Sequence, residues 1–185
     1  MKGIHKLGTV IAKILEVFHW VGTALMAAAT VCSVIAPQWV GKFVAVDGKE
    51  CCGANLEVYG FEINAPMTAG QVDGTHFLLF GIGASLILAV MAMVFRNLYR
   101  VLKLSEDATP FQKETVRLLR AIGVLVLAVP VIGFLMSIVV RLVTGAETAE
   151  IALDLGGVFM GIVVLILTRW FVRGAELEND VDGLL

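Results

Sequence analysis

Four long apolar stretches, separated by short polar segments, limit what this chain can fold into more than any motif does. They lie at about residues 14–35, 76–95, 121–143 and 151–172, and each is long enough to cross about 30 Å of hydrocarbon as a helix. Hydrophobic residues make up 58% of the 185 residues and charged residues only 16%, which is unlike a soluble domain. Because a bilayer offers no water to backbone polar groups, the sequence predicts an all-α membrane protein whose four transmembrane helices form one bundle domain, residues 1–185.

The basic residues divide unequally between the two sides of this predicted domain. Of the 14 lysines and arginines, only Lys42, Lys49 and Arg141 fall on one side. The other side holds the rest, together with both chain termini. The excess predicts that both termini are cytoplasmic, as are residues 96–120 and the tail, residues 173–185, and that residues 36–75 are external.

The first apolar stretch also has an alternative interpretation as a signal peptide. Ala27-x-Ala29 is a small-residue pattern of the kind that precedes cleavage. The stretch continues to Ile35, however, which is longer than a typical signal core. We therefore expect an uncleaved helix.

The external segment, residues 36–75, carries signs of β-structure. The apolar residues 43–46 precede the turn signal Asp47-Gly48, and a second β-prone stretch follows at residues 56–63. An isolated hairpin is only marginally stable. The sequence therefore predicts a small β-containing cap that rests on the outer helix ends or on a neighbouring subunit.

Basic residues at helical spacing flank the middle of the cytoplasmic loop. Thr109, Pro110 and Gln112 have the order of an N-cap, a first helical residue and the end of a capping box, so the third helix is expected to begin well before its apolar stretch. The two predicted stripes are Arg96, Arg100 and Lys103, and Lys113, Arg117 and Arg120. The stripes are typical of contact with anionic lipid headgroups. Docking of a protein partner is the alternative, or docking of the acidic tail, residues 174–182, whose alternating acidic residues do not form a helical stripe.

The start of the third helix also carries a resemblance to a known family. The phrase Thr109-Pro110-Phe111-Gln112-x-Glu114-x-Val116-x-x-Leu119-Arg120-x-Ile122-Gly123 is similar to the signature of a bacterial membrane family, domain of unknown function 2975. The resemblance implies four spans in a bacterial cytoplasmic membrane, an outer segment after the first span, and a C-terminal segment led by Arg173-Gly174. Members often lie beside helix-turn-helix regulators, which implies a regulatory role. The cysteine pair and the Asp-rich ending depart from the family pattern.

The cysteines leave three interpretations open. Cys51 and Cys52 are adjacent in the external segment and Cys32 lies near the outer end of the first span. An adjacent pair closes only a strained ring, so a structural disulfide would join Cys32 to one of the two; redox chemistry and free thiols are the alternatives. The layout also resembles membrane thiol oxidoreductases of the disulfide-bond-forming type, but the second cysteine pair through which those enzymes relay electrons is missing here.

Ionisable residues inside the spans are candidates for function because they are costly there. Glu16 and His19 share a face of the first helix. Arg141 and Asp154 are expected to form a partly buried ion pair or a water-bridged contact across the short second outer loop. They could form a proton relay, as in a transporter, or serve as interface anchors and helix contacts. Gly157 and Gly161, at the same helical face as Asp154, predict close packing against another helix.

The sequence lacks the signatures of most enzymes. It contains no metal-ligand cluster, phosphate-binding loop or Ser-His-Asp arrangement, its histidines are too far apart to ligate one haem, and its net charge of −2 does not favour nucleic acid. We therefore expect a non-enzymatic membrane sensor or regulatory protein without a cofactor. Its expected partners are the lipid bilayer, a cytoplasmic regulatory protein and a second copy of the chain. A small transporter or channel is the alternative, and a thiol oxidoreductase is the third.

Overall fold

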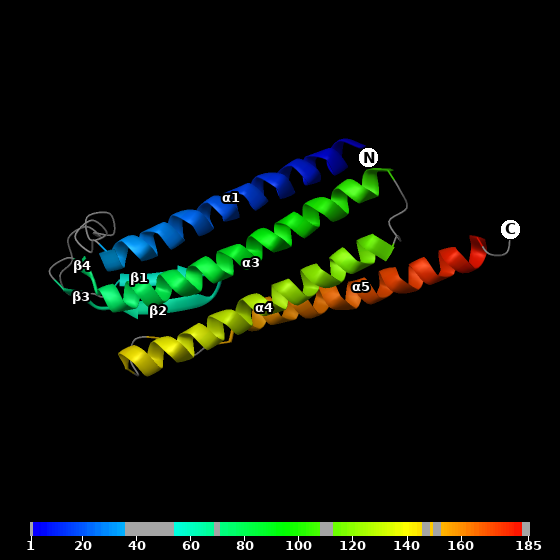
Figure 1. Ribbon diagram of the computed structural model, residues 1–185. Helices are drawn as coiled ribbons and strands as arrows, with labels where there is room; N and C mark the ends of the chain where they lie inside the picture. The colour runs from blue at the N-terminus through cyan, green and yellow to red at the C-terminus, as the bar shows by residue number, and fades with distance from the viewer. Residues whose placement is uncertain are drawn as a thin grey trace. The chain divides into compact units, whose positions relative to one another are not determined.

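Four long helices form most of the structure, a computed structural model that describes residues 2–35, 54–68, 71–107, 113–145, 149 and 153–182. They are α1 (Lys2–Ile35), α3 (Gly74–Asp107), α4 (Lys113–Thr144) and α5 (Leu155–Asp182) (Figure 1). Each contains a segment long and apolar enough to cross a membrane. The four predicted spans are thus confirmed as helices, whereas the direction in which each crosses stays a prediction.

The last helix differs from its prediction at both ends. It begins at Leu155, so Asp154 directly precedes it, whereas the predicted span begins at about residue 151. Aspartate is a preferred residue just before a first helical turn because its carboxylate can accept from free backbone N–H groups. At the other end α5 continues to Asp182, so the acidic segment is helical although its alternating charges do not predict it.

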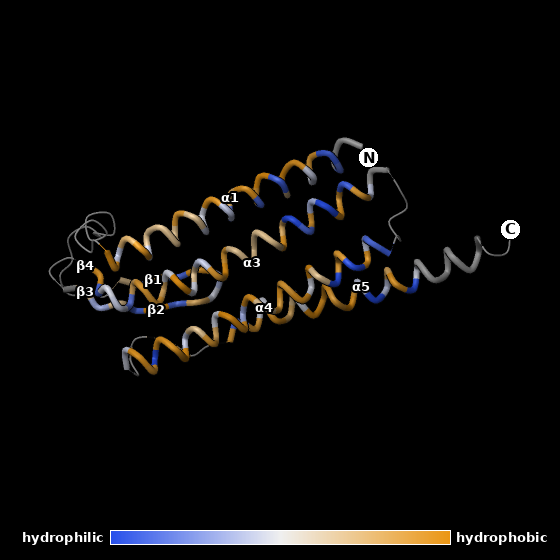
Figure 2. Tube along the Cα trace, viewed as in Figure 1, coloured by the Kyte–Doolittle hydropathy of each residue, from blue (hydrophilic) through white to orange (hydrophobic). Residues whose placement is uncertain are grey.

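Internal contacts divide the chain into two compact units. One consists of Met1–His19, Val90–Ala128 and Leu155–Leu185; we call it the basic-end unit, because the two predicted basic stripes lie in it. The other consists of Trp20–Ala89 and Val129–Asp154, and we call it the hairpin-end unit. Figure 2 shows the hydrophilic residues of the second half of α3 and of the first turns of α4, which belong to the basic-end unit.

The core of the basic-end unit is aliphatic. Val94 and Val101 of α3 and Ile122 of α4 are buried together, and Val164 of α5 packs against them. Further leucines of α3 and α4 surround this cluster, namely Leu98, Leu118, Leu119 and Leu125.

Helices α4 and α5 interlock within the basic-end unit through two glycine–leucine pairs. A Cβ atom on Gly161 would lie 2.5 Å from Cγ of Leu127, and one on Gly123 would lie 2.6 Å from Cδ2 of Leu165. Each helix therefore places a leucine over a glycine of the other. The predicted helix contact of Gly161 is present, and Gly157 is half-buried on the same helix.

The hairpin-end unit contains a β-hairpin. Strands β1 (Ala54–Val58) and β2 (Phe61–Ala65) pair antiparallel, with Val58 opposite Phe61. Tyr59 and Gly60 connect them with φ angles of 47° and 77°, as in a two-residue type I′ turn. Two shorter strands, β3 (Met67–Thr68) and β4 (Gln71–Val72), form a second antiparallel pair.

The position of the hairpin corrects the predicted cap. Phe61, Ile63 and Ala65 are fully buried, because alternate residues of β2 turn one apolar face toward the helices. The Phe61 ring stacks on Phe80 of α3 with centroids 5.8 Å apart. The hairpin thus packs along α3 instead of resting on helix ends (Figure 1). The predicted turn Asp47-Gly48 lies outside the described residues, and the turn seen here falls inside the stretch 56–63.

Candidate functional site

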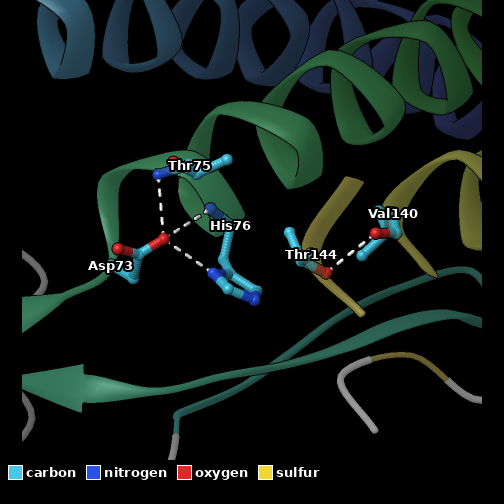
Figure 3. A network of polar contacts seen from close by, with 5 residues as sticks. All are labelled: Asp73, Thr75, His76, Val140 and Thr144. Carbon is cyan, nitrogen blue, oxygen red and sulfur yellow. Dashed lines mark hydrogen bonds and ion pairs between the residues drawn. The ribbon is translucent and has the colours of Figure 1, made fainter. Parts of the chain in front are cut away.

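The first turn of α3 holds the most organised polar cluster of the hairpin-end unit. Asp73 precedes the helix, and its Oδ2 accepts hydrogen bonds from the backbone N–H groups of Thr75 and His76 at 3.1 and 3.2 Å (Figure 3). Its own N–H donates to the Pro66 carbonyl at 3.0 Å, and its carbonyl accepts from the N–H of Phe77 at 3.0 Å. Asp73 is therefore the N-cap of α3, and it also joins the helix to the end of the hairpin.

The same carboxylate holds the imidazole of His76. Nδ1 of His76 donates to Oδ2 of Asp73 at 2.7 Å. This hydrogen bond, with the backbone hydrogen bonds from His76 and Thr75, holds the pKa of Asp73 below its usual value, against a smaller opposing effect of burial. With Nδ1 as the donor, Nε2 of the neutral ring is left as an acceptor.

That acceptor is enclosed. His76 is only 7% exposed, and Nε2 is buried without a hydrogen-bond partner among the described residues. Figure 3 also includes the last turns of α4, where the Thr144 hydroxyl donates to the Val140 carbonyl at 2.8 Å. No group of three or more His, Cys, Asp or Glu residues within the described ranges could hold a metal ion. The cluster therefore fixes the orientation of an imidazole.

Both predicted basic stripes are exposed in the basic-end unit. The solvent-exposed residues are Arg96, Arg100 and Lys103 on α3 and Lys113, Arg117 and Arg120 on α4. The apolar residues between them, such as Leu98 and Leu118, turn toward the aliphatic core instead. Thr109, Pro110 and Gln112, the predicted start of the third helix, lie outside the described residues.

The predicted polar face of α1 is also present. Glu16 is 8% exposed, and its Oε2 lies 2.9 Å from Nζ of Lys13. His19 is buried one turn further along, with Nδ1 2.7 Å from the Leu15 carbonyl and its ring 4.9 Å from that of Phe95 on α3. Lys13 Nζ lies 5.1 Å from the centre of the Tyr99 ring. Aromatic side chains of α3 therefore shield these polar groups.

The expected contact between Arg141 and Asp154 stays a prediction. The Arg141 side chain is exposed and Asp154 is half-buried. A Cβ on Gly60 would lie 3.1 Å from Cβ of Asp154, so Asp154 lies against the hairpin turn. Lys13 and Glu16 form an ion pair among the described side chains.

The cysteine interpretations stay open. Cys32 is exposed on α1. Cys51 and Cys52 lie outside the described residues, so the predicted disulfide does too.

Comparison of the chain with models of protein families, with curated proteins and with solved structures finds no match. Function must therefore be argued from the residues and their geometry.

Sequence reasoning missed the Asp73–His76 pair. The available signal was an aspartate directly before a long apolar run, which is an N-cap pattern, with a histidine three residues later. It also missed the insertion of the hairpin, because the apolar residues of β2 give no indication of which helices cover them.

Proposed function

We propose that this chain is a non-enzymatic membrane sensor or regulatory protein, with both termini in the cytoplasm. The observation that supports it is that α3 and α4 each contact the hairpin and each carry one of the basic stripes. Gly83 of α3 and Gly133 of α4 each lie against Phe61 of the hairpin, and each of these helices carries three exposed basic residues further along its length. A displacement of the hairpin would therefore act on both helices that present the basic stripes.

The basic stripes would be the output of such a protein. Six exposed basic side chains attract an anionic surface of a protein, and also anionic lipid headgroups, which contribute about 1 kcal/mol per basic residue. The resemblance of residues 109–123 to domain of unknown function 2975 makes a soluble helix-turn-helix regulator the first partner to test.

The test is capture of soluble cytoplasmic proteins by the purified chain. Reversing the charge of Arg100, Lys103, Lys113 and Arg117 to glutamate should abolish capture and leave the melting temperature unchanged, because these side chains are exposed. Arg141→Glu reverses an exposed basic residue of the hairpin-end unit and should not affect capture. If the reversed form captures the same proteins but binds anionic vesicles more weakly, the stripes are lipid anchors and the proposal is wrong.

A small transporter is the second candidate, and the buried polar face of α1 favours it. Glu16 and His19 are both more than nine-tenths buried in a predicted span, where ionisable groups often mark proton or ion pathways. Transport predicts proton-coupled flux in vesicles that Glu16→Gln abolishes and Glu114→Gln, at an exposed position of α4, does not. Vesicles that show no flux with the wild-type chain would remove this candidate.

A further inference from the structure

The depth of the hairpin can be measured along the helices that hold it. Phe61 contacts α4 at Gly133, and the eight residues from Gly133 to Arg141 rise about 12 Å. On α3 it contacts Gly83, and the seven residues from His76 to Gly83 rise about 10 Å. Both helices therefore place the hairpin turn about 10 Å below the polar residues that end their apolar stretches.

The hairpin lies parallel to α3. Its far end is fixed where the Pro66 carbonyl accepts from the N–H of Asp73, and its turn end is fixed at Gly83. The five residues from Phe61 to Pro66 span about 17 Å as a strand, and the ten from Asp73 to Gly83 span about 15 Å as a helix. The two lengths agree, so the strands run from the helix end into the predicted membrane layer.

Apolar side chains of α4 continue outward past this level. Leu135, Val139, Leu142 and Val143 are all exposed, with exposed fractions from 41% to 81%. Along a span assigned by its length and composition, exposed aliphatic residues are expected to face lipid. On that expectation the hydrocarbon layer reaches well beyond the level of Phe61.

The second face of the hairpin is polar. Opposite the apolar face, Asn55 pairs with Asn64 and Glu57 pairs with Glu62 across the strands. Asn55, Glu57 and Asn64 are exposed and Glu62 is half-buried. Nδ2 of Asn55 donates to Oε1 of Glu62 at 2.6 Å.

Directly opposed carboxylates repel each other, and charged groups facing hydrocarbon are strongly disfavoured. Non-helical backbone occurs at this depth only where protein buries it or water reaches it.

We propose that water enters the predicted membrane layer along this polar face. The chain then holds an aqueous recess that opens at the hairpin end and is lined by Asn55, Glu57, Glu62 and Asn64. Its two carboxylates favour small hydrophilic cations over anions of the same size. The recess is independent of the regulatory role of the basic stripes.

Thiol reactivity in lipid nanodiscs tests the recess, because both membrane faces are then accessible and orientation does not matter. In a chain with Cys32, Cys51 and Cys52 changed to serine, Glu57→Cys is the probe, with Glu62→Cys as a second probe should the first fail to fold. Leu135→Cys, at a similar depth but facing lipid, is the matched control, and Ile63→Cys reports the buried face.

Charged methanethiosulfonate reagents should modify Glu57→Cys at least tenfold faster than Leu135→Cys or Ile63→Cys. An ammonium-bearing reagent should also react faster than a sulfonate-bearing one, and Glu62→Gln should reduce that ratio. Equal, slow reaction of the charged reagents at Glu57→Cys, Glu62→Cys and Leu135→Cys would show that lipid or a second copy covers the polar face and would overturn the proposal. Rapid reaction without preference for the ammonium reagent would overturn the cation selectivity.

Discussion

Leu127 of α4 lies directly over Gly161 of α5, so close that a Cβ on the glycine would be 2.5 Å from Cγ of the leucine and 3.1 Å from the Leu127 backbone nitrogen. Gly123 and Leu165 repeat this relationship with the roles of the helices exchanged. In a membrane, helices associate through such close packing rather than through release of water. The two pairs therefore fix the register of α4 against α5.

The first prediction concerns this packing. Gly161→Leu and Gly123→Leu should each lower the free energy of unfolding by about 1–3 kcal/mol, because the new side chain must displace a leucine and adjacent backbone. Thermal melting in detergent measures the loss. Gly74→Ala is the control, since a Cβ there meets no atom within 4 Å.

A compensating change separates packing from other effects of the substitution. Leu127→Ala should restore part of the stability that Gly161→Leu loses, because it frees the space that the new side chain needs. Additive losses in the double variant would contradict the proposed contact.

The two glycines also show what the sequence could reveal here. Gly161 is predictable because Gly157, one turn earlier, gives the small-residue spacing of a helix contact. The contact of Gly123 is not predictable, because its partner Leu165 lies on another helix and no pattern within α4 identifies that leucine. A membrane-spanning helix is predictable because it depends only on the length of one apolar stretch. A contact between helices is not, because it depends on which helices pack together.

The second prediction concerns the hairpin turn. Gly60 has a φ of 77°, which costs a β-branched residue about 1–2 kcal/mol or more, and a Cβ there would lie 3.1 Å from Cβ of Asp154. Gly60→Val should therefore lower the melting temperature, whereas Tyr59→Asn, which suits the left-handed conformation of a type I′ turn, should not. Equal stability of Gly60→Val and wild type would argue against this turn.

The third prediction concerns how the hairpin is held. Phe61 is fully buried between residues of α3 and α4, so Phe61→Ala should cost about 3–5 kcal/mol by leaving a cavity. Phe159 on α5 is 65% exposed, and Phe159→Ala should cost far less. Equal melting temperatures for the two variants would mean that the hairpin contributes little to stability.

The hairpin was only partly predictable from the sequence. The β-prone residues 56–63 are visible as a pattern, but a turn at Tyr59-Gly60 lacks the common Asn-Gly or Asp-Gly signal, and Asp47-Gly48 has that signal elsewhere. The insertion depends on Gly83, where a Cβ would lie only 2.6 Å from the Phe61 ring. Such complementarity between distant segments has no local signature.

The fourth prediction concerns how the stability contributed by Asp73, the N-cap of α3, depends on pH. Hydrogen bonds from His76 and Thr75 depress the pKa of Asp73 in the folded chain, so the carboxylate contributes stability at pH values above the unfolded pKa of about 3.9. That contribution is lost as pH falls through the lower folded pKa. Asp73→Ala should cost about 0.5–2 kcal/mol near neutral pH.

Asp73→Asn isolates the titrating part of this contribution. Asparagine can still cap the helix but cannot ionise, so the variant should be less stable than wild type at pH 6, by less than Asp73→Ala is. This difference should shrink as pH falls below about 4, because the unfolded wild-type carboxylate then takes up a proton before the folded one does, whose pKa is lower. Melting temperatures of the three forms between pH 6 and pH 3 supply the comparison. A constant gap between wild type and Asp73→Asn over that range would show that the ionised carboxylate has no special part in holding His76.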